Sequence, residues 1–178
     1  MVLNTKEGIL EIKKTIENQF ELEKEIYTLG FSNKSRDVNE VEQISIQFIK
    51  DGKITLWFYT TLMNKLFKPE PIKTSPNRKM LKLSSFKVDD VLLYFNEAVV
   101  LVEKETKEFE NYRLEGFDME VDEKSGKIIH SFNLLADKTT KSTSFYGKRL
   151  EKNLFRFKFR TDKKGVLQCV EGLNVFEE

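Results

Sequence analysis

The chain is poor in the residues on which most familiar site chemistry depends. Its 178 residues include one cysteine, one histidine, three prolines and eight glycines. A single cysteine cannot form an intrachain disulfide, and one cysteine with one histidine cannot supply the ligands of a structural zinc site. A catalytic Ser-His-Asp or Cys-His pair would have to use His130. Because His130 and Cys169 both occur in strand-like runs, IIHSFNL and VLQCVEG, we expect them to pack rather than to react.

Phosphate-binding loops and long apolar runs are also missing. No GxxxxGK[ST] or GxGxxG motif occurs, so we expect no nucleotide cofactor, and we expect no metal. The longest apolar runs, 91–95 and 98–102, are far shorter than the roughly 20 residues that cross a bilayer. The N-terminus lacks the basic start and long apolar run of a secretory signal. We therefore expect a cytoplasmic protein that does not contact a membrane.

The composition is that of a globular protein with a large aromatic core. Hydrophobic residues make up 39% of the chain and charged residues 33%, and fifteen residues are phenylalanine. This length and composition predict a single domain over residues 1–178. The net charge of +1 gives no overall field that would attract nucleic acid or an anionic membrane.

The N-terminal part of the sequence predicts an amphipathic helix over residues 5–29. Asn4 or Thr5 can cap its first turn, and Gly30 follows its predicted end. Lysine and glutamate occupy the polar face. The predicted apolar stripe consists of Ile9, Ile12, Ile16, Phe20 and Tyr27.

From Val41 onward the apolar period changes to two, which indicates strands. The sequence predicts hairpins over 41–61, 112–135 and 154–176, and pairing of 142–149 with 154–160. In the first hairpin Ile44, Ile46 and Phe48 alternate with polar residues, and Ile54, Leu56 and Phe58 resume the alternation after the turn. The predicted aromatic core is Phe48, Phe58, Phe117, Phe132, Phe155, Phe157 and Phe159.

Two segments are harder to assign. Residues 91–102 favour two strands around Asn96-Glu97, because a helix there would be apolar nearly all round. The helical alternative places Val91, Phe95, Ala98 and Val102 on one face. All three prolines lie in 69–76, so residues 65–80 predict a basic loop or arm rather than sheet.

No internal repeat of fixed period is visible. The elements together predict a mainly β protein, α+β by count. We expect the N-terminal helix to pack on an antiparallel β-sandwich or partly closed barrel of about eight to ten strands, with its main body over 81–178.

The heptapeptide LFRFKFR, residues 154–160, alternates aromatic and cationic side chains. In a strand, successive side chains point to opposite faces, so Phe155, Phe157 and Phe159 lie on one face and the cations on the other. A platform that stacks bases needs rings and cations on the same exposed face. The heptapeptide therefore favours a strand whose rings face the core.

Charge is segregated along the chain despite the neutral total. Residues 65–87 carry seven basic and one acidic side chain, 89–124 carry four basic and twelve acidic, and 138–164 carry ten basic and two acidic. The blocks predict separate basic and acidic faces. The candidate basic face consists of Lys68, Lys73, Arg78, Lys79, Lys82, Lys148, Arg149, Arg156, Lys158 and Arg160. The candidate acidic face consists of Asp118, Glu120 and Asp122.

These observations predict a non-catalytic binding module, of an accessory or inhibitory kind, that meets a macromolecular partner, a protein rather than a nucleic acid. One alternative is a nucleic-acid-binding protein that uses the basic segments 65–87 and 138–164. A second is a carboxylate or metal-dependent enzyme that uses Asp118, Glu120 and Asp122, which are also consistent with the solvated face of an edge strand. Opposite charge blocks can also join two copies, and we expect a homodimer.

Overall fold

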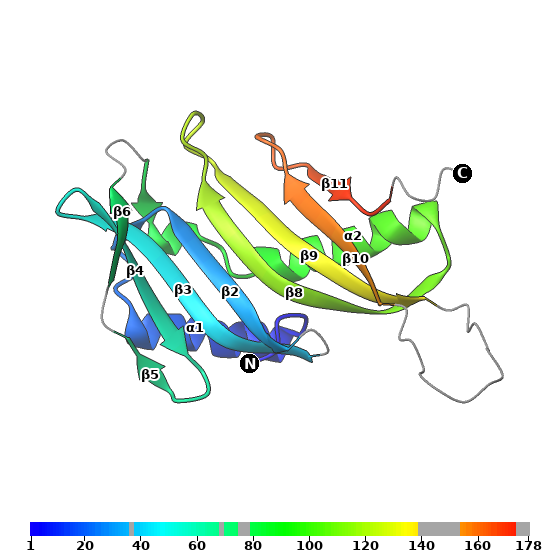
Figure 1. Ribbon diagram of the computed structural model, residues 1–178, viewed down its shortest axis with the longest axis horizontal. Helices are drawn as coiled ribbons and strands as arrows, with labels where there is room; N and C mark the ends of the chain where they lie inside the picture. Colours follow the sequence, from blue (N-terminus) through cyan, green and yellow to red (C-terminus); the bar gives the residue numbers. More distant parts are fainter. Residues whose placement is uncertain (36–37, 68–69, 75–78, 139–153, 174–178) are drawn as a thin grey trace.

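The fold is built around one large antiparallel sheet that does not close on itself (Figure 1). The computed structural model describes the chain apart from residues 36–37, 68–69, 75–78, 139–153 and 174–178. Within the described residues, nine strands form the main sheet in the order β11-β10-β9-β8-β2-β3-β4-β5, with β6 also paired to β4. The mainly β, antiparallel prediction is confirmed, but a layer of helices takes the place of a second sheet.

The main-sheet strands before the second helix are β2 (Thr28–Ser35), β3 (Val38–Lys50), β4 (Lys53–Thr60), β5 (Lys65–Leu66) and β6 (Glu70–Thr74). Those after it are β8 (Phe109–Val121), β9 (Ile128–Lys138), β10 (Leu154–Thr161) and β11 (Leu167–Glu171). Two short strands, β1 (Glu25–Ile26) and β7 (Leu81–Lys82), pair separately. The three predicted hairpins are present as β3–β4, β8–β9 and β10–β11. The predicted pairing of 142–149 lies outside the described residues.

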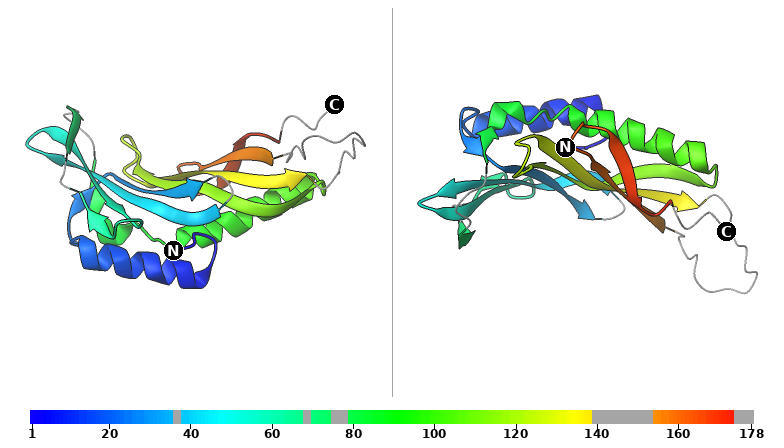
Figure 2. Two further views of the ribbon diagram at one scale, coloured as in Figure 1. Left: turned by 60° about the horizontal axis from the view of Figure 1, so that its bottom comes forward. Right: turned by 90° about the horizontal axis from the view of Figure 1, so that it is seen from above.

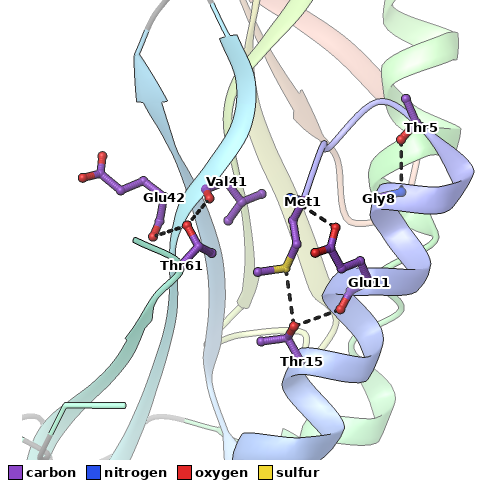
Figure 3. Close-up of polar contacts among 8 residues, drawn as sticks. All are labelled: Met1, Thr5, Gly8, Glu11, Thr15, Val41, Glu42 and Thr61. Carbon is purple, nitrogen blue, oxygen red and sulfur yellow. Dashed lines mark hydrogen bonds and ion pairs between the residues drawn. The ribbon is translucent and has the colours of Figure 1, made fainter. Parts of the chain in front are cut away.

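Both helices lie on the same side of the sheet, and no described element covers the opposite side (Figure 2). The N-terminal helix α1 (Lys6–Gln19) is capped by Thr5, whose hydroxyl accepts a hydrogen bond from the Gly8 amide at 3.1 Å (Figure 3). A Cβ on Gly8 would lie 1.9 Å from the Val2 carbonyl oxygen, so only glycine allows this close approach. The chain's amino group also pairs with Glu11 at 3.2 Å.

The helix predicted over 5–29 is shorter than expected. It ends at Gln19, and Phe20 already has an extended backbone. Leu29 and Phe31 are buried as part of β2, which pairs with both β3 and β8 in the middle of the sheet. These long-range pairings outweigh the local helical pattern in the second half of the predicted helix.

Residues 91–102 are helical, and the prediction of two strands there is wrong. The helix α2 (Asp90–Glu105) buries Val91, Phe95, Ala98 and Val102, which are the four residues of the helical alternative. A helix that is apolar nearly all round does not need every apolar side chain to be buried. In fact Leu93 is 59% exposed on its outer face, and isolated exposed apolar side chains are normal in soluble proteins. Neither helix in the described part of the chain is long and apolar enough to cross a membrane.

The fold contains an internal repeat that the sequence does not reveal. The first half runs α1-β2-β3-β4 and the second runs α2-β8-β9-β10. In the sheet, the order β4-β3-β2 continues antiparallel into β8-β9-β10, so each half begins at the centre of the sheet and proceeds outward. Figure 1 shows the two halves side by side. The two halves are therefore similar αβββ units arranged about the β2–β8 pair.

The proline-containing segment contributes to the sheet, contrary to the prediction of a loop or arm. Strand β6 pairs with β4, and Pro71 stands opposite Thr55 with a register shift beside it. In the described residues β6 pairs with no other strand, and such an edge position tolerates a residue without an amide hydrogen.

The core lies between the sheet and the helices. Five of the seven predicted aromatic residues are at most 5% exposed, namely Phe48, Phe117, Phe132, Phe157 and Phe159. Phe155 is half-buried and contacts Phe109 edge-on, with ring centroids 5.0 Å apart. Phe58 was predicted in the core, but the register places it on the opposite face with Ser45, where it stacks on Phe67.

Candidate functional site

The open face, defined here as the side of the main sheet away from α1 and α2, differs between the two halves of the fold. In the first half, three cross-strand rows run from β2 through β3 to β4. These rows contain no charged residue. Their members are Thr28, Gln47 and Leu56; Gly30, Ser45 and Phe58; and Ser32, Gln43 and Thr60.

The second half of the open face is charged. Its rows run from β8 through β9 to β10. These rows are Asp118, Ser131 and Arg160; Glu115, Asn133 and Lys158; and Arg113, Leu135 and Arg156. The acidic strand β8 and the basic strand β10 thus lie on either side of β9 within one chain. The described parts of the acidic block 89–124 and of the basic block 138–164 therefore contribute to one surface.

Most of these charges are neutralised by neighbouring strands. The Arg156 guanidinium pairs with the Glu115 carboxylate, with Nε–Oε2 and Nη2–Oε1 distances of 2.7 Å. Lys158 pairs with Glu171 of β11 at 3.4 Å. Arg113 pairs with Asp137 through two nitrogens, the nearer at 2.6 Å. The cations of β10 therefore mostly face carboxylates of their own chain.

Asp118 and Arg160 are the exceptions. Both are exposed, and neither forms an ion pair with any residue that the structure describes. Asp118 sits beside Gly30, where an added Cβ would lie 2.5 Å from its Oδ1 atom. The residue as a whole is exposed, but its carboxylate lies close to the backbone of β2 at Gly30. The resulting loss of hydration raises the pKa of Asp118, and the negative charge of Glu120 raises it further.

The third acidic candidate, Asp122, has a structural role in the turn between β8 and β9. Its Oδ1 atom accepts hydrogen bonds from the amide and the hydroxyl of Ser125, each at 2.7 Å. These hydrogen bonds lower the pKa of Asp122 because they stabilise the ionised carboxylate. The three predicted acidic residues are therefore not equivalent, and no group of three or more His, Cys, Asp or Glu in the described residues could hold a metal ion.

A surface hollow of about 300 Å³ lies at the end of the charged half. Glu120 and Asp122 line it together with Arg160 and Lys163, and Ile129 contributes an apolar wall. The hollow thus brings two residues of the predicted acidic face together with one of the predicted basic face. Sequence analysis did not anticipate this because strand register, not residue order, makes them neighbours.

The other predicted basic residues do not form one face. Lys79 donates a hydrogen bond to the Lys124 carbonyl at 3.1 Å, and Lys82 pairs with Glu23, whose carboxylate raises the pKa of Lys82. Lys73 belongs to β6, next to β4 and at the opposite end of the sheet from β10, and its side chain is not among those described. The structure does not describe Lys68, Arg78, Lys148 or Arg149.

Sequence analysis also missed a buried polar cluster beneath α2. His130 is 5% exposed on the core face of β9, and its Nε2 atom lies 3.2 Å from Asp90 Oδ2. The alignment there is too poor for a hydrogen bond, and neither ring nitrogen has a hydrogen-bond partner in the described part of the chain. The centroids of the Tyr94 and His130 rings are 4.6 Å apart. The cluster joins the start of α2 to β9 and does not line the surface hollow described above.

Comparison of the chain with family models, with curated proteins and with solved structures found no match.

Proposed function

We propose that the chain is a non-catalytic interaction module that binds a macromolecular partner, a protein rather than a nucleic acid, through the open face of its sheet. One observation carries the proposal. Asp118 and Arg160 remain without ion-pair partners in the described residues, whereas the other charged members of the three rows, Arg113, Glu115, Arg156 and Lys158, are paired. In the first half of the fold, the corresponding rows across β2, β3 and β4 contain no charged residue.

The mixture of charges favours a protein partner. Binding to a phosphate backbone requires a run of unpaired cations that displace the counterions condensed on the phosphates. On the open face Arg156 and Lys158 already pair with carboxylates, and Asp118 would repel phosphate. The strand β6 and the strand β10, which come from the two basic segments, also lie at opposite ends of the main sheet. Protein interfaces commonly use complementary charges of both signs.

A peptide selection tests the proposal and needs no named partner. Random displayed peptides are selected on the full chain and then compared on the double variant Asp118→Asn/Arg160→Gln. We expect enriched peptides that bind the wild-type chain and lose binding to the double variant. Lys158→Gln is the matched control, because it removes a charge from the same face that is already paired. No enrichment, or equal binding to the double variant, would contradict the proposal.

The nucleic-acid alternative is tested separately by fluorescence anisotropy with short single- and double-stranded oligonucleotides. Tight binding that falls steeply between low and high salt would replace the protein-partner proposal. The absence of binding at low salt would remove the alternative. For the carboxylate enzyme, an unchanged melting temperature in magnesium, calcium and manganese would remove the metal-dependent form.

We include in the proposal a cytoplasmic location and a homodimer. An ion pair joins β10 to β8 within one chain, so a second copy is not needed to neutralise the charges of these two strands. The better dimer contact is the edge strand β11, which pairs only with β10 in the described residues. Val170 within β11 is 46% exposed, and Val166 immediately before the strand is 54% exposed. Light scattering should therefore give a dimer that persists in 1 M salt, where the Debye length is about 3 Å. A monomer at all salt concentrations would refute it.

A further inference from the structure

The two charges without ion-pair partners have opposite signs and occupy the same cross-strand row. Asp118 of β8 pairs in register with Ser131 of β9, and Ser131 pairs with Arg160 of β10. Neighbouring strands are about 4.8 Å apart, which places the Cα atoms of Asp118 and Arg160 about 10 Å apart. No ion pair joins the two side chains. Asp118 and Arg160 therefore lie on one surface with Ser131 between them in the row, and the Asp118 carboxylate lies beside Gly30 of β2.

A ligand with charge of only one sign fits this row poorly. An anion that approached Arg160 would also meet the carboxylate of Glu120, which lines the hollow beside it. A cation that approached Asp118 gains a partner, but Arg160 then still lacks one. A ligand with one charge of each sign satisfies both residues, since opposite charges attract across the row. The hollow adds Lys163 for the anionic end and Ile129 for an aliphatic stem.

We propose that the row formed by Asp118, Ser131 and Arg160, with the adjacent hollow, binds an extended polypeptide segment that carries a basic and an acidic side chain two residues apart. This inference rests on the proposed function, because it names the kind of partner that the open face takes. Side chains at positions i and i+2 of an extended segment point the same way and are spaced by about 6.5 Å. The flexible side chains of the segment reach across the remaining distance to Asp118 and Arg160.

The test uses the full-length chain labelled with nitrogen-15 and short synthetic peptides. Four peptides of equal length contain a central Lys-Ser-Glu, Lys-Ser-Lys, Glu-Ser-Glu or Lys-Ser-Gln sequence. We expect the Lys-Ser-Glu peptide to bind most tightly and to shift the amide signals of β8, β9 and β10. Asp118→Asn and Arg160→Gln should each weaken its binding about three- to fivefold, the effect of one exposed charge pair. Lys158→Gln should leave it unchanged.

The Lys-Ser-Gln peptide makes the test specific for the paired arrangement. If Arg160 contacts the acidic side chain, Arg160→Gln should weaken the binding of Lys-Ser-Glu but not of Lys-Ser-Gln. Melting curves check that each variant is folded, and Arg160→Lys gives a second variant that keeps the charge. Equal effects of Arg160→Gln on both peptides would overturn the assignment of Arg160.

The remaining outcomes separate this inference from the proposed function. If Lys-Ser-Lys or Glu-Ser-Glu binds as tightly as the mixed peptide, the two-sign inference is wrong, although the open face still binds peptides. If free zwitterionic amino acids bind as tightly as the peptides, the site takes a small molecule and the peptide assignment is wrong. If no peptide binds and the display selection finds none, both the inference and the proposed function fail.

Discussion

Replacing Phe157 by alanine distinguishes between two interpretations of the LFRFKFR strand. In one its rings are buried in the core, and in the other they form an exposed platform that stacks bases. The Phe157 side chain is fully buried, and its ring meets the Phe109 ring edge-on at 5.1 Å between centroids. Deleting a buried phenylalanine ring costs about 3–5 kcal/mol, from lost burial and from the cavity that remains. For a chain of this length, about 4 kcal/mol corresponds to a fall in melting temperature of about 8–16 °C. If the rings instead formed an exposed stacking platform, the substitution would change stability little.

Urea unfolding followed by circular dichroism measures this difference. Lys158→Ala is the matched control, because Lys158 is the next residue on the opposite face and its side chain is 51% exposed. Its ion pair with Glu171 contributes about 0–1 kcal/mol. The slope of the unfolding free energy against urea should stay unchanged in both variants. A loss below about 1 kcal/mol for Phe157→Ala, or equal losses for the two variants, would refute the assignment of faces.

Four further substitutions test three other parts of the structure. The raised pKa of Asp118 means that the folded state holds this proton more tightly than the unfolded state, so stability is lost as the pH rises through the pKa of the folded state. Asp118→Asn should therefore raise the urea midpoint at pH 7. At a pH well below the ordinary carboxyl pKa of 3.8 this gain should disappear. An equal gain at pH 7 and at the low pH would contradict this. In α2, Val102→Asp should lower the free energy of unfolding by at least about 3 kcal/mol because it buries a charge. Leu93→Asp, on the exposed face, should change it by no more than about 0.5 kcal/mol. Similar melting curves for the two variants would show that the face of α2 assigned to the core is wrong. His130→Ala should lower stability by about 2 kcal/mol or more through a core cavity without changing peptide binding, and a folded variant that no longer binds would show a functional role for His130.

The three hairpins were predictable because each depends on contacts between neighbouring parts of the chain. A period of two, interrupted by a short turn-forming stretch, is enough to predict two paired strands. The β3–β4 hairpin also shows where this reasoning stops. Its two-residue turn, Asp51-Gly52, pairs Lys50 with Lys53 and hence Phe48 with Thr55. That register turns Phe58 to the open face, whereas an apolar pattern alone suggested the core.

The sequence by itself determined the capped start of α1, the strand periods, and the separation of rings and cations in residues 154–160. Each of these follows from local backbone geometry and from the burial of alternating apolar side chains. Only the tertiary structure decided that β2 lies beside β8, that the two αβββ units form one sheet, and that Asp118 and Arg160 share a row. These features join residues that are far apart in the chain. Strand order and register depend on the free energy of the whole packed sheet, and no local pattern records them.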